Sequence, residues 1–156
     1  MIRESNIKFI KSGEKKRLLN TLKEQFGISK LKSWIFVETG KGKIRGFSGS
    51  MTRDEIDELS EIANVEVIGL YLFRVENNRL RLSMDGSGIF GESANNGVVD
   101  IDENEMNVWI RGGNIERELE NGIYIIKNGD DFLGCGISDG KKLINHVPKE
   151  RRIRNG

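Results

Sequence analysis

The C-terminal stretch from Gly122 to Arg154 limits the possible folds of this chain more than any other, because it alternates apolar runs with tight-turn signals. Asn128-Gly129 and Asp139-Gly140 separate the runs, and both pairs favour the positive φ of two-residue hairpin turns. The proline at position 148 then ends regular pairing. The pattern predicts a three-strand meander with strands at residues 123–126, 132–137 and 141–145.

Two features of this meander indicate more than a plain sheet. Gly134 and Gly136 lie inside the second run, which predicts a bulge, a sharp bend or a place where another backbone comes close. A basic tail follows the proline. Such a tail is either a solvated end or charge that is presented from a rigid sheet, and the pattern alone favours neither.

The composition excludes several classes of protein. The 156 residues suffice for one domain or two small ones. No apolar run is long enough to span a bilayer and the N-terminus lacks the apolar segment of a signal peptide, so we expect a cytoplasmic protein. The single cysteine, Cys135, excludes an internal disulfide, and with the single histidine, His146, it cannot build a Cys/His zinc site. We therefore predict neither a metal site nor a cofactor.

Charge is strongly segregated along the chain, although the net charge is only +1. Residues 1–46 carry twelve Lys and Arg against four Asp and Glu, and residues 132–156 carry six against two. The middle, residues 47–131, reverses this balance with seven against eighteen. If the two basic ends fold onto one face, that face suits a polyanion despite the near-neutral total.

The first 85 residues predict an α+β module with the order strand, helix, hairpin, helix and strands. Apolar residues recur at the helical period between positions 18 and 26, and Thr52 with Glu55 forms the capping box of a second helix. The Gly/Lys segment 38–43 lacks the P-loop spacing, so we interpret it as a hairpin turn with a basic tip.

The last strand of this module, residues 79–84, alternates basic and apolar side chains. Successive side chains of a strand point to opposite faces of a sheet. We therefore expect Leu80 and Leu82 to face the core, and Arg79 and Arg81 to face solvent.

A segment rich in Gly, Ser and Asn, residues 86–97, predicts a linker or a long surface loop. It divides the chain into an N-terminal module, residues 1–85, and a C-terminal domain, residues 98–156. Within the second part, residues 108–110 are predicted as a strand and residues 116–119 as a single helical turn.

The second half of the chain resembles the PUA domain. VWIRGGNI followed by ENGIYIIKNGDDFLGCGI has the PUA pattern, in which Arg-Gly-x-x-Ile leads out of a strand and a later strand reads Leu-Gly-x-Gly. The run Leu143-x-Asn145-x-x-Pro148-Lys149-x-Arg151 is more specific, and it is similar to the end of the PUA-like segment of Sun-type RNA cytosine-5 methyltransferases. The likeness covers residues 107–154, about a third of the chain. The first half is similar only in layout to the pre-PUA modules of archaeal and eukaryotic RNA-processing proteins.

The resemblance implies an RNA-binding pseudo-barrel that contacts structured RNA, but the chain also departs from the methyltransferases. Those enzymes carry a catalytic cysteine in a Pro-Cys motif and a glycine-rich loop for S-adenosylmethionine. Here Cys135 lies between two glycines and the single proline is Pro148, so the catalytic half is missing. We interpret Cys135 as a small buried apolar residue, and Asp130 and Asp131 as turn residues. The expected protein is therefore not an enzyme.

The candidate RNA contacts are of several kinds. Arg111 with Gly112 lies at the expected strand–helix junction, where backbone N–H groups can meet a phosphate or a base edge. Gly134 and Gly136 leave room for a backbone to approach. Asn145 either hydrogen-bonds a base or ribose or caps a turn. The cationic candidates for phosphate contacts are Lys141, Lys142, Lys149, Arg151, Arg152 and Arg154.

The predicted fold class is thus α+β, with the N-terminal module followed by a PUA-like β pseudo-barrel. The predicted function is recognition of structured RNA, tRNA or rRNA, in RNA modification or ribosome assembly. A stand-alone targeting subunit for an RNA methyltransferase is one form of that function. The alternative is a protein-interaction subunit whose acidic middle segment docks a basic partner without direct RNA binding. A small enzyme that uses Asp130 and Asp131 is a third hypothesis.

Overall fold

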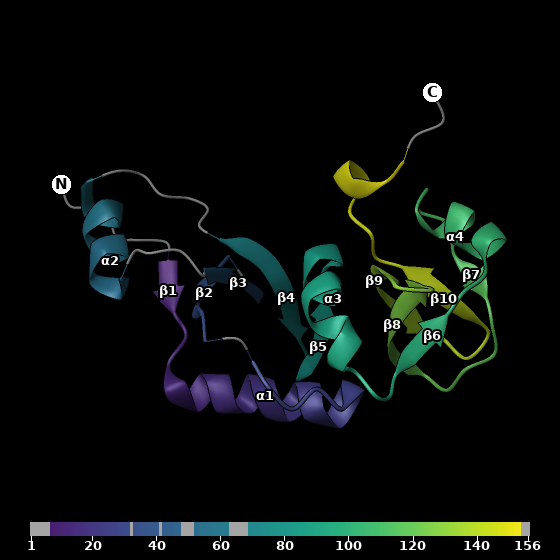
Figure 1. The fold of residues 1–156 in the computed structure, drawn as a ribbon, viewed down its shortest axis with the longest axis horizontal. Helices are drawn as coiled ribbons and strands as arrows, with labels where there is room; N and C mark the ends of the chain where they lie inside the picture. The colour runs from purple at the N-terminus through teal and green to yellow at the C-terminus, as the bar shows by residue number, and fades with distance from the viewer. Residues whose placement is uncertain (1–6, 32, 41, 48–51, 63–68, 154–156) are drawn as a thin grey trace.

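The molecule is built on two five-stranded sheets that follow one another along the chain (Figure 1). The computed structural model describes residues 7–31, 33–40, 42–47, 52–62 and 69–153. The strand order is β1-β2-β3-β4-β5 in the N-terminal sheet and β6-β8-β9-β10-β7 in the C-terminal sheet. Helices accompany both sheets and the C-terminal sheet is curled, so the fold is α+β, as the sequence predicts.

The N-terminal sheet is antiparallel throughout, and each strand pairs with its neighbour in the chain. Leu80 and Leu82 are buried while Arg79 is exposed, which confirms the alternation predicted for the last strand. The strands are β1 (Ile7–Phe9), β2 (Ile35–Thr39), β3 (Lys43–Phe47), β4 (Leu70–Glu76) and β5 (Arg79–Leu82).

A β-bulge interrupts the pairing of β3 with β4. Arg45 pairs with Tyr71, whereas the preceding Ile44 pairs with Phe73, so Leu72 is the extra residue. Leu72 and Phe73 are both fully buried, although neighbours in a regular strand face opposite sides of a sheet. The bulge therefore changes which β4 side chains share the outer face.

Two helices lie within the described residues of the N-terminal module. Helix α1 (Ser12–Phe26) buries Leu22 and Phe26 against the face of the sheet that carries Ile44. Helix α2 (Arg53–Ile62) begins with the predicted capping box, because Glu55 N–H donates to Thr52 Oγ1 and Thr52 N–H donates to Glu55 Oε2, each at 3.2 Å. No helix in the described ranges is long and apolar enough to cross a membrane.

A helix stands where the sequence predicts a linker or surface loop over residues 86–97. Helix α3 (Met84–Phe90) lies between β4 and β9 (Figure 1), and the 3₁₀ turn η1 (Gly91–Ser93) follows it. Ser83 caps α3 by accepting from Gly86 N–H at 2.9 Å. A Cβ on Gly86 would come within 2.1 Å of the Leu72 carbonyl oxygen, so this glycine serves close packing. The loop prediction is wrong because it equated a glycine-rich composition with a flexible surface segment.

The C-terminal sheet contains the predicted meander as β8, β9 and β10, with β6 added parallel to β8 and β7 added to β10. The first turn is shifted by one residue, because Asn128 pairs with Asp131 and leaves Gly129 and Asp130 as the turn. The strands are β6 (Val98–Asp100), β7 (Ile115–Glu116), β8 (Gly122–Asn128), β9 (Asp131–Ser138) and β10 (Lys142–Asn145).

Two local predictions in this half are wrong. Residues 108–110 were expected as a strand, but α4 (Glu103–Trp109) includes the first two of them. On this helix Trp109 points into the core and is fully buried, whereas the neighbouring Val108 points outward and is 48% exposed. Residues 116–119 were expected as a helical turn, but the first of them pairs in β7. Short apolar runs do not distinguish helix from strand without their tertiary partners.

The buried apolar side chains of the described residues form two hydrophobic clusters. The first joins α1, the N-terminal sheet and α3 with Ile125 and Cys135 of the C-terminal sheet. The second lies within the C-terminal sheet around Trp109, whose Nε1–H donates to the Leu133 carbonyl at 2.8 Å. The two sheets therefore share apolar contacts, and the division into residues 1–85 and 98–156 stays a prediction.

Candidate nucleic-acid interface

The basic tail folds back onto the end of α4. Backbone Ile153 N–H donates to the Ile110 carbonyl at 2.9 Å. The side chain of Arg152 covers Gly112, where a Cβ would lie 2.6 Å from Arg152 Nε. The short 3₁₀ turn η2 (Lys149–Arg151) precedes this contact. We call the group at this end of the sheet the tail cluster: Arg111, Gly112, Lys149, Arg151 and Arg152.

Asn145 holds the tail cluster in place with all the polar atoms of its side chain. Its Nδ2 donates to the carbonyls of Trp109 at 2.7 Å and Gly113 at 2.9 Å. Its Oδ1 accepts from Val147 N–H at 2.7 Å. The geometry therefore supports the capping role that the sequence analysis considered beside RNA contact.

The two strand glycines are buried by the protein itself. A Cβ on Gly136 would come within 2.8 Å of the Trp109 ring. Gly134 N–H donates to Ser87 Oγ of α3 at 2.9 Å, and its φ is +80°. The predicted close approach thus exists at Gly136, where the approaching group is the Trp109 ring, whereas Gly134 borders the cleft described below. Contact of either glycine with RNA stays a prediction.

The two lysines after β9 lie at the opposite end of β10 from the tail cluster. Asp139 accepts from the backbone N–H groups of Lys141 and Lys142, each at 2.9 Å, and these bonds lower the pKa of its carboxyl. Lys142 pairs with Glu116 across the sheet. The predicted cations therefore form two separate groups, and Arg154 lies outside the described residues.

A cleft of about 430 Å³ lies beside the tail cluster. Strands β3, β4 and β5 supply one wall, and His146, Pro148 and Arg151 supply part of the other. We call it the inter-module cleft. Its charged lining residues are Lys43, Arg45, Arg74, Arg81 and Arg151, with the acids Asp85 and Glu150.

Strand register places the cleft's cations together. Arg74 pairs with Lys43 on one side and with Arg81 on the other, and Arg45 pairs with Tyr71. Directly paired side chains point to the same face of a sheet. Arg74 lies three positions after Tyr71, so a regular strand would place the two side chains on opposite faces, and the bulge brings them to one face. All five side chains are half-buried.

Tyr71 lies among these cations. Burial raises the pKa of its phenol, while the charges of Arg81, Arg74 and Arg45 act in the opposite direction. The Nζ of Lys43 is 5.6 Å from the ring centroid, and the guanidinium carbon of Arg45 is 5.8 Å from it. The cleft therefore combines an aromatic ring with several positive charges.

His146 joins the two walls of the cleft. Its Nδ1 is 3.0 Å from Nη1 of Arg81. A guanidinium can only donate, so Nδ1 accepts and the imidazole is neutral with its proton on Nε2. Partial burial lowers the pKa of His146, and the charge of Arg81 lowers it further against the opposing effect of Glu76.

The residues that a catalytic hypothesis would use lie in two different settings, Cys135 in the core and the two aspartates on the surface. Cys135 is buried, which raises the pKa of its thiol to about 12, and this confirms the interpretation of a small buried residue. Asp130 and Asp131 are exposed at the β8–β9 turn. Among the described residues no group of three or more His, Cys, Asp or Glu side chains could hold a metal ion.

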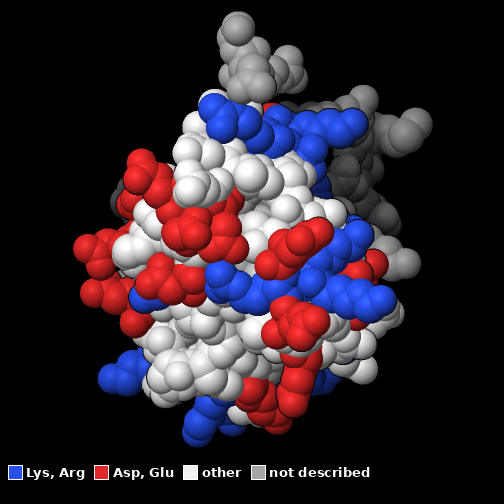
Figure 2. All heavy atoms as spheres, turned by 90° about the vertical axis from the view of Figure 1, so that its right-hand side faces the viewer, with Lys and Arg blue, Asp and Glu red and all other residues white. Residues whose placement is uncertain are grey.

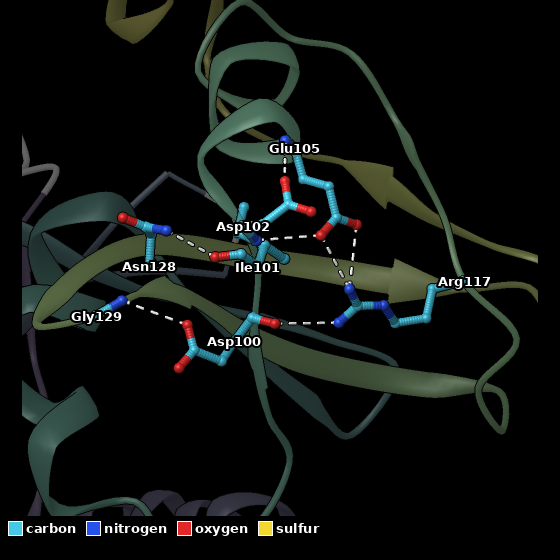
Figure 3. A network of polar contacts seen from close by, with 7 residues as sticks. All are labelled: Asp100, Ile101, Asp102, Glu105, Arg117, Asn128 and Gly129. Carbon is cyan, nitrogen blue, oxygen red and sulfur yellow. Dashed lines mark hydrogen bonds and ion pairs between the residues drawn. The ribbon is translucent and has the colours of Figure 1, made fainter.

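Part of the acidic middle segment is engaged inside the molecule (Figure 3). Arg117 Nη2 donates to both carboxylate oxygens of Glu105, at 3.0 and 3.1 Å, and its Nη1 donates to the Asp100 carbonyl at 3.2 Å. Asp102 caps α4 by accepting from Glu105 N–H at 2.8 Å. These acids stabilise α4 against β6, which reduces what they can offer a basic partner.

Charges of both signs lie on the side of the molecule that carries α4 and β7. Figure 2 shows Lys and Arg at the end where the C-terminus leaves the molecule, and cations interleaved with Asp and Glu across the middle. Among the described residues on this side, the cations away from the tail end therefore lie beside acidic side chains.

Residues 96–153 match the family model described as the methyltransferase RsmF PUA domain. The match includes the whole C-terminal sheet, α4 and the tail cluster. This segment is a PUA domain. The resemblance to Sun-type methyltransferases is thereby confirmed for these residues, and the PUA domain indicates RNA binding and a link to that methyltransferase family. A comparison with curated proteins gave no match for the chain.

Sequence reasoning missed the cations of the inter-module cleft. Arg81 was expected on the outer face, but no pattern connected it with Lys43, Arg45 or Arg74. The available signal was the spacing Lys43-x-Arg45 in one strand and Arg79-x-Arg81 in another, which places positive side chains on the outer face. The bulge at Leu72 has no such signal, so Tyr71 and Arg74 were not assigned to one face.

Proposed function

We propose that this protein binds structured RNA, tRNA or rRNA, and that it acts in RNA modification or ribosome assembly. The observation that carries the proposal is the coincidence of two features in one segment. Residues 96–153 match a PUA domain, and that domain ends in the tail cluster, where Arg111 and Lys149 are exposed. Cations on a capped, rigid end can contact phosphates without ordering a loose segment on binding.

The finer role that we propose is a targeting subunit for an RNA methyltransferase that acts as a separate chain. The support is the type of PUA domain, since the matching family model comes from a methyltransferase. The expected outcome is that a tagged form of this chain co-purifies with a cytosine-5 methyltransferase after ribonuclease treatment. Loss of the enzyme on that treatment would indicate a shared RNA instead of a targeting complex.

The RNA proposal is tested by equilibrium binding of total tRNA and rRNA fragments across a salt series, with heparin as a polyanion without RNA structure. We expect tighter binding to folded RNA than to heparin. Arg111→Gln with Lys149→Gln should weaken RNA binding about tenfold and reduce the salt slope by about one for each lost phosphate contact.

The matched control carries the same change in charge elsewhere. Lys16 and Lys23 are exposed on α1. This helix covers the face of the N-terminal sheet that points away from the inter-module cleft. Lys16→Gln with Lys23→Gln should therefore leave the affinity and the salt slope close to those of the unmodified protein. Equal binding to heparin and folded RNA, or no binding to either, would overturn the proposal.

A further inference from the structure

The inter-module cleft carries more positive charge than the fold requires. Five cationic side chains line it against two acidic ones. Arg151 is paired with Asp85 at 3.2 Å. Lys43 and Arg74 make no ion pair with any described residue, and both are half-buried.

The remaining two arginines are directed to neutral partners. Arg45 Nε donates to Thr39 Oγ1 at 3.0 Å. Arg81 Nη1 lies 3.0 Å from the neutral His146 ring. Four charges thus gather on one half-buried wall without a carboxylate partner among the described residues. Such an arrangement is unfavourable for folding by itself, because partial burial weakens hydration and like charges repel. A bound anion would relieve both effects.

The backbone holds these groups in fixed relative positions. Lys43, Arg74 and Arg81 are neighbours across three paired strands, and the bulge adds Tyr71 to the same face. A bulge that re-aims a side chain is commonly found next to a functional site. The cleft is therefore a pre-formed wall of donors with one aromatic ring.

We propose that the inter-module cleft binds an unpaired stretch of the RNA whose folded part is held by the PUA domain. The proposal rests on the proposed function and names the N-terminal sheet as the second half of the RNA site. The phosphates lie against Arg74, Arg81 and Lys43, and a base lies near Tyr71. Aromatic rings among cations are the usual means by which proteins bind unpaired nucleotides.

The size of the cleft selects this form of RNA. A volume of about 430 Å³ lies in the range of pockets that enclose small molecules. Such a space accommodates a nucleotide-sized group, whereas an A-form duplex would lie across its mouth. In the tail cluster, on the other hand, Arg111 and Lys149 are exposed outside the cleft lining, where they can contact a duplex backbone. The two sites therefore differ in the RNA that they accept.

The experiment compares three probes by fluorescence anisotropy: total tRNA, a blunt-ended RNA duplex and a short single-stranded RNA. The cleft variant is Arg74→Gln with Arg81→Gln. We expect it to bind tRNA and the single strand about tenfold more weakly and to bind the duplex normally. The salt slope for the single strand should fall by about 0.7 for each lost phosphate contact. The tail variant, Arg111→Gln with Lys149→Gln, should weaken binding of the duplex.

Two controls keep the test decisive. Arg74→Gln alone removes a side chain that has no ion pair among the described residues, so it reports on the cleft even if the double variant folds poorly. Lys16→Gln with Lys23→Gln removes two charges outside the cleft and should change nothing.

The outcomes separate the two proposals. If the unmodified protein binds RNA and both cleft variants bind tRNA as tightly as it does, the inference about the cleft is overturned and the proposed function stands. If the unmodified protein binds no RNA, both fail. If free uridine monophosphate binds the cleft as tightly as the single strand does, the site is one for a small phosphate ligand and the RNA inference is overturned.

Discussion

The two sheets of this protein hold their positive charges in different ways. In the N-terminal sheet the cations of the inter-module cleft lie on strands, where hydrogen-bonded register sets the positions of Lys43, Arg74 and Arg81. In the PUA domain the cations of the tail cluster lie in the turn after α4 and in the tail, where side-chain caps such as Asn145 set them. Both sites depend on hydrogen bonds, but the first uses backbone bonds and the second uses a few side chains.

This difference has a consequence for how each site fails. Removing one side chain from a sheet leaves the register of its strands intact, so the cleft loses one charge at a time. Removing a cap releases a whole segment, so the tail cluster can lose several contacts together. A substitution in the cleft should therefore leave the other cations of the cleft in place, whereas loss of a cap should displace several groups of the tail cluster.

The largest expected effect comes from the core beneath the tail cluster. Trp109→Ala removes a fully buried ring and its hydrogen bond to Leu133, so we expect the free energy of unfolding to fall by about 3–5 kcal/mol. Urea denaturation followed by far-UV circular dichroism measures the loss. The other tryptophan, Trp34, remains in this variant, and its fluorescence still reports on the N-terminal module.

Val108→Ala is the control for this experiment, since Val108 lies next to Trp109 on α4 but is 48% exposed. It should change the stability by less than about 0.5 kcal/mol. A similar small loss for Trp109→Ala would contradict the view that this ring anchors the end of α4 and the tail cluster.

An intermediate effect is expected at the cap itself. Asn145→Ala leaves the carbonyls of Trp109 and Gly113 and the N–H of Val147 without their partner, so we expect a loss of about 1–3 kcal/mol in the free energy of unfolding. Thermal and urea denaturation measure it.

Asn107→Ala supplies the comparison, because Asn107 is exposed on α4. If the Asn145→Ala variant were as stable as the Asn107→Ala variant but bound RNA more weakly than that variant, Asn145 would be an RNA contact and not a cap.

The smallest effect is expected where the two regions meet, at His146. Its pKa lies below the ordinary 6.5 because partial burial and Arg81 disfavour the imidazolium, so the unfolded chain binds the proton more readily. The stability that this group contributes is present above pH 6.5 and is lost as the pH falls from there through the folded pKa. Protonation of Nδ1 also removes the bond to Arg81.

A single histidine makes this prediction easy to measure. An NMR titration of the one imidazole should give a pKa below 6.5. The stability of His146→Gln should fall less between pH 7.5 and pH 5 than that of the unmodified protein. A measured pKa at or above 6.5 would mean that the effect of Glu76 on His146 outweighs the effects of burial and of the Arg81 charge.

Prediction from the sequence succeeded where a local pattern has one structural solution. The capping box of Thr52 and Glu55 and the inward leucines of β5 follow from spacing alone. It failed where a short pattern has two solutions, as at residues 108–110. It failed again at residues 86–97, where close packing and flexibility both favour glycine.

The sequence by itself determined the α+β class, the C-terminal meander and the PUA resemblance, because each rests on periodicity or on a motif within one segment. Only the tertiary structure decided which cations share a surface. Lys43, Arg74, Arg81 and Arg151 come from four separate segments, and their meeting depends on strand register, on the bulge at Leu72 and on the packing of α3 between the sheets. Such long-range contacts have no local signature, because the residues that make them are far apart along the chain.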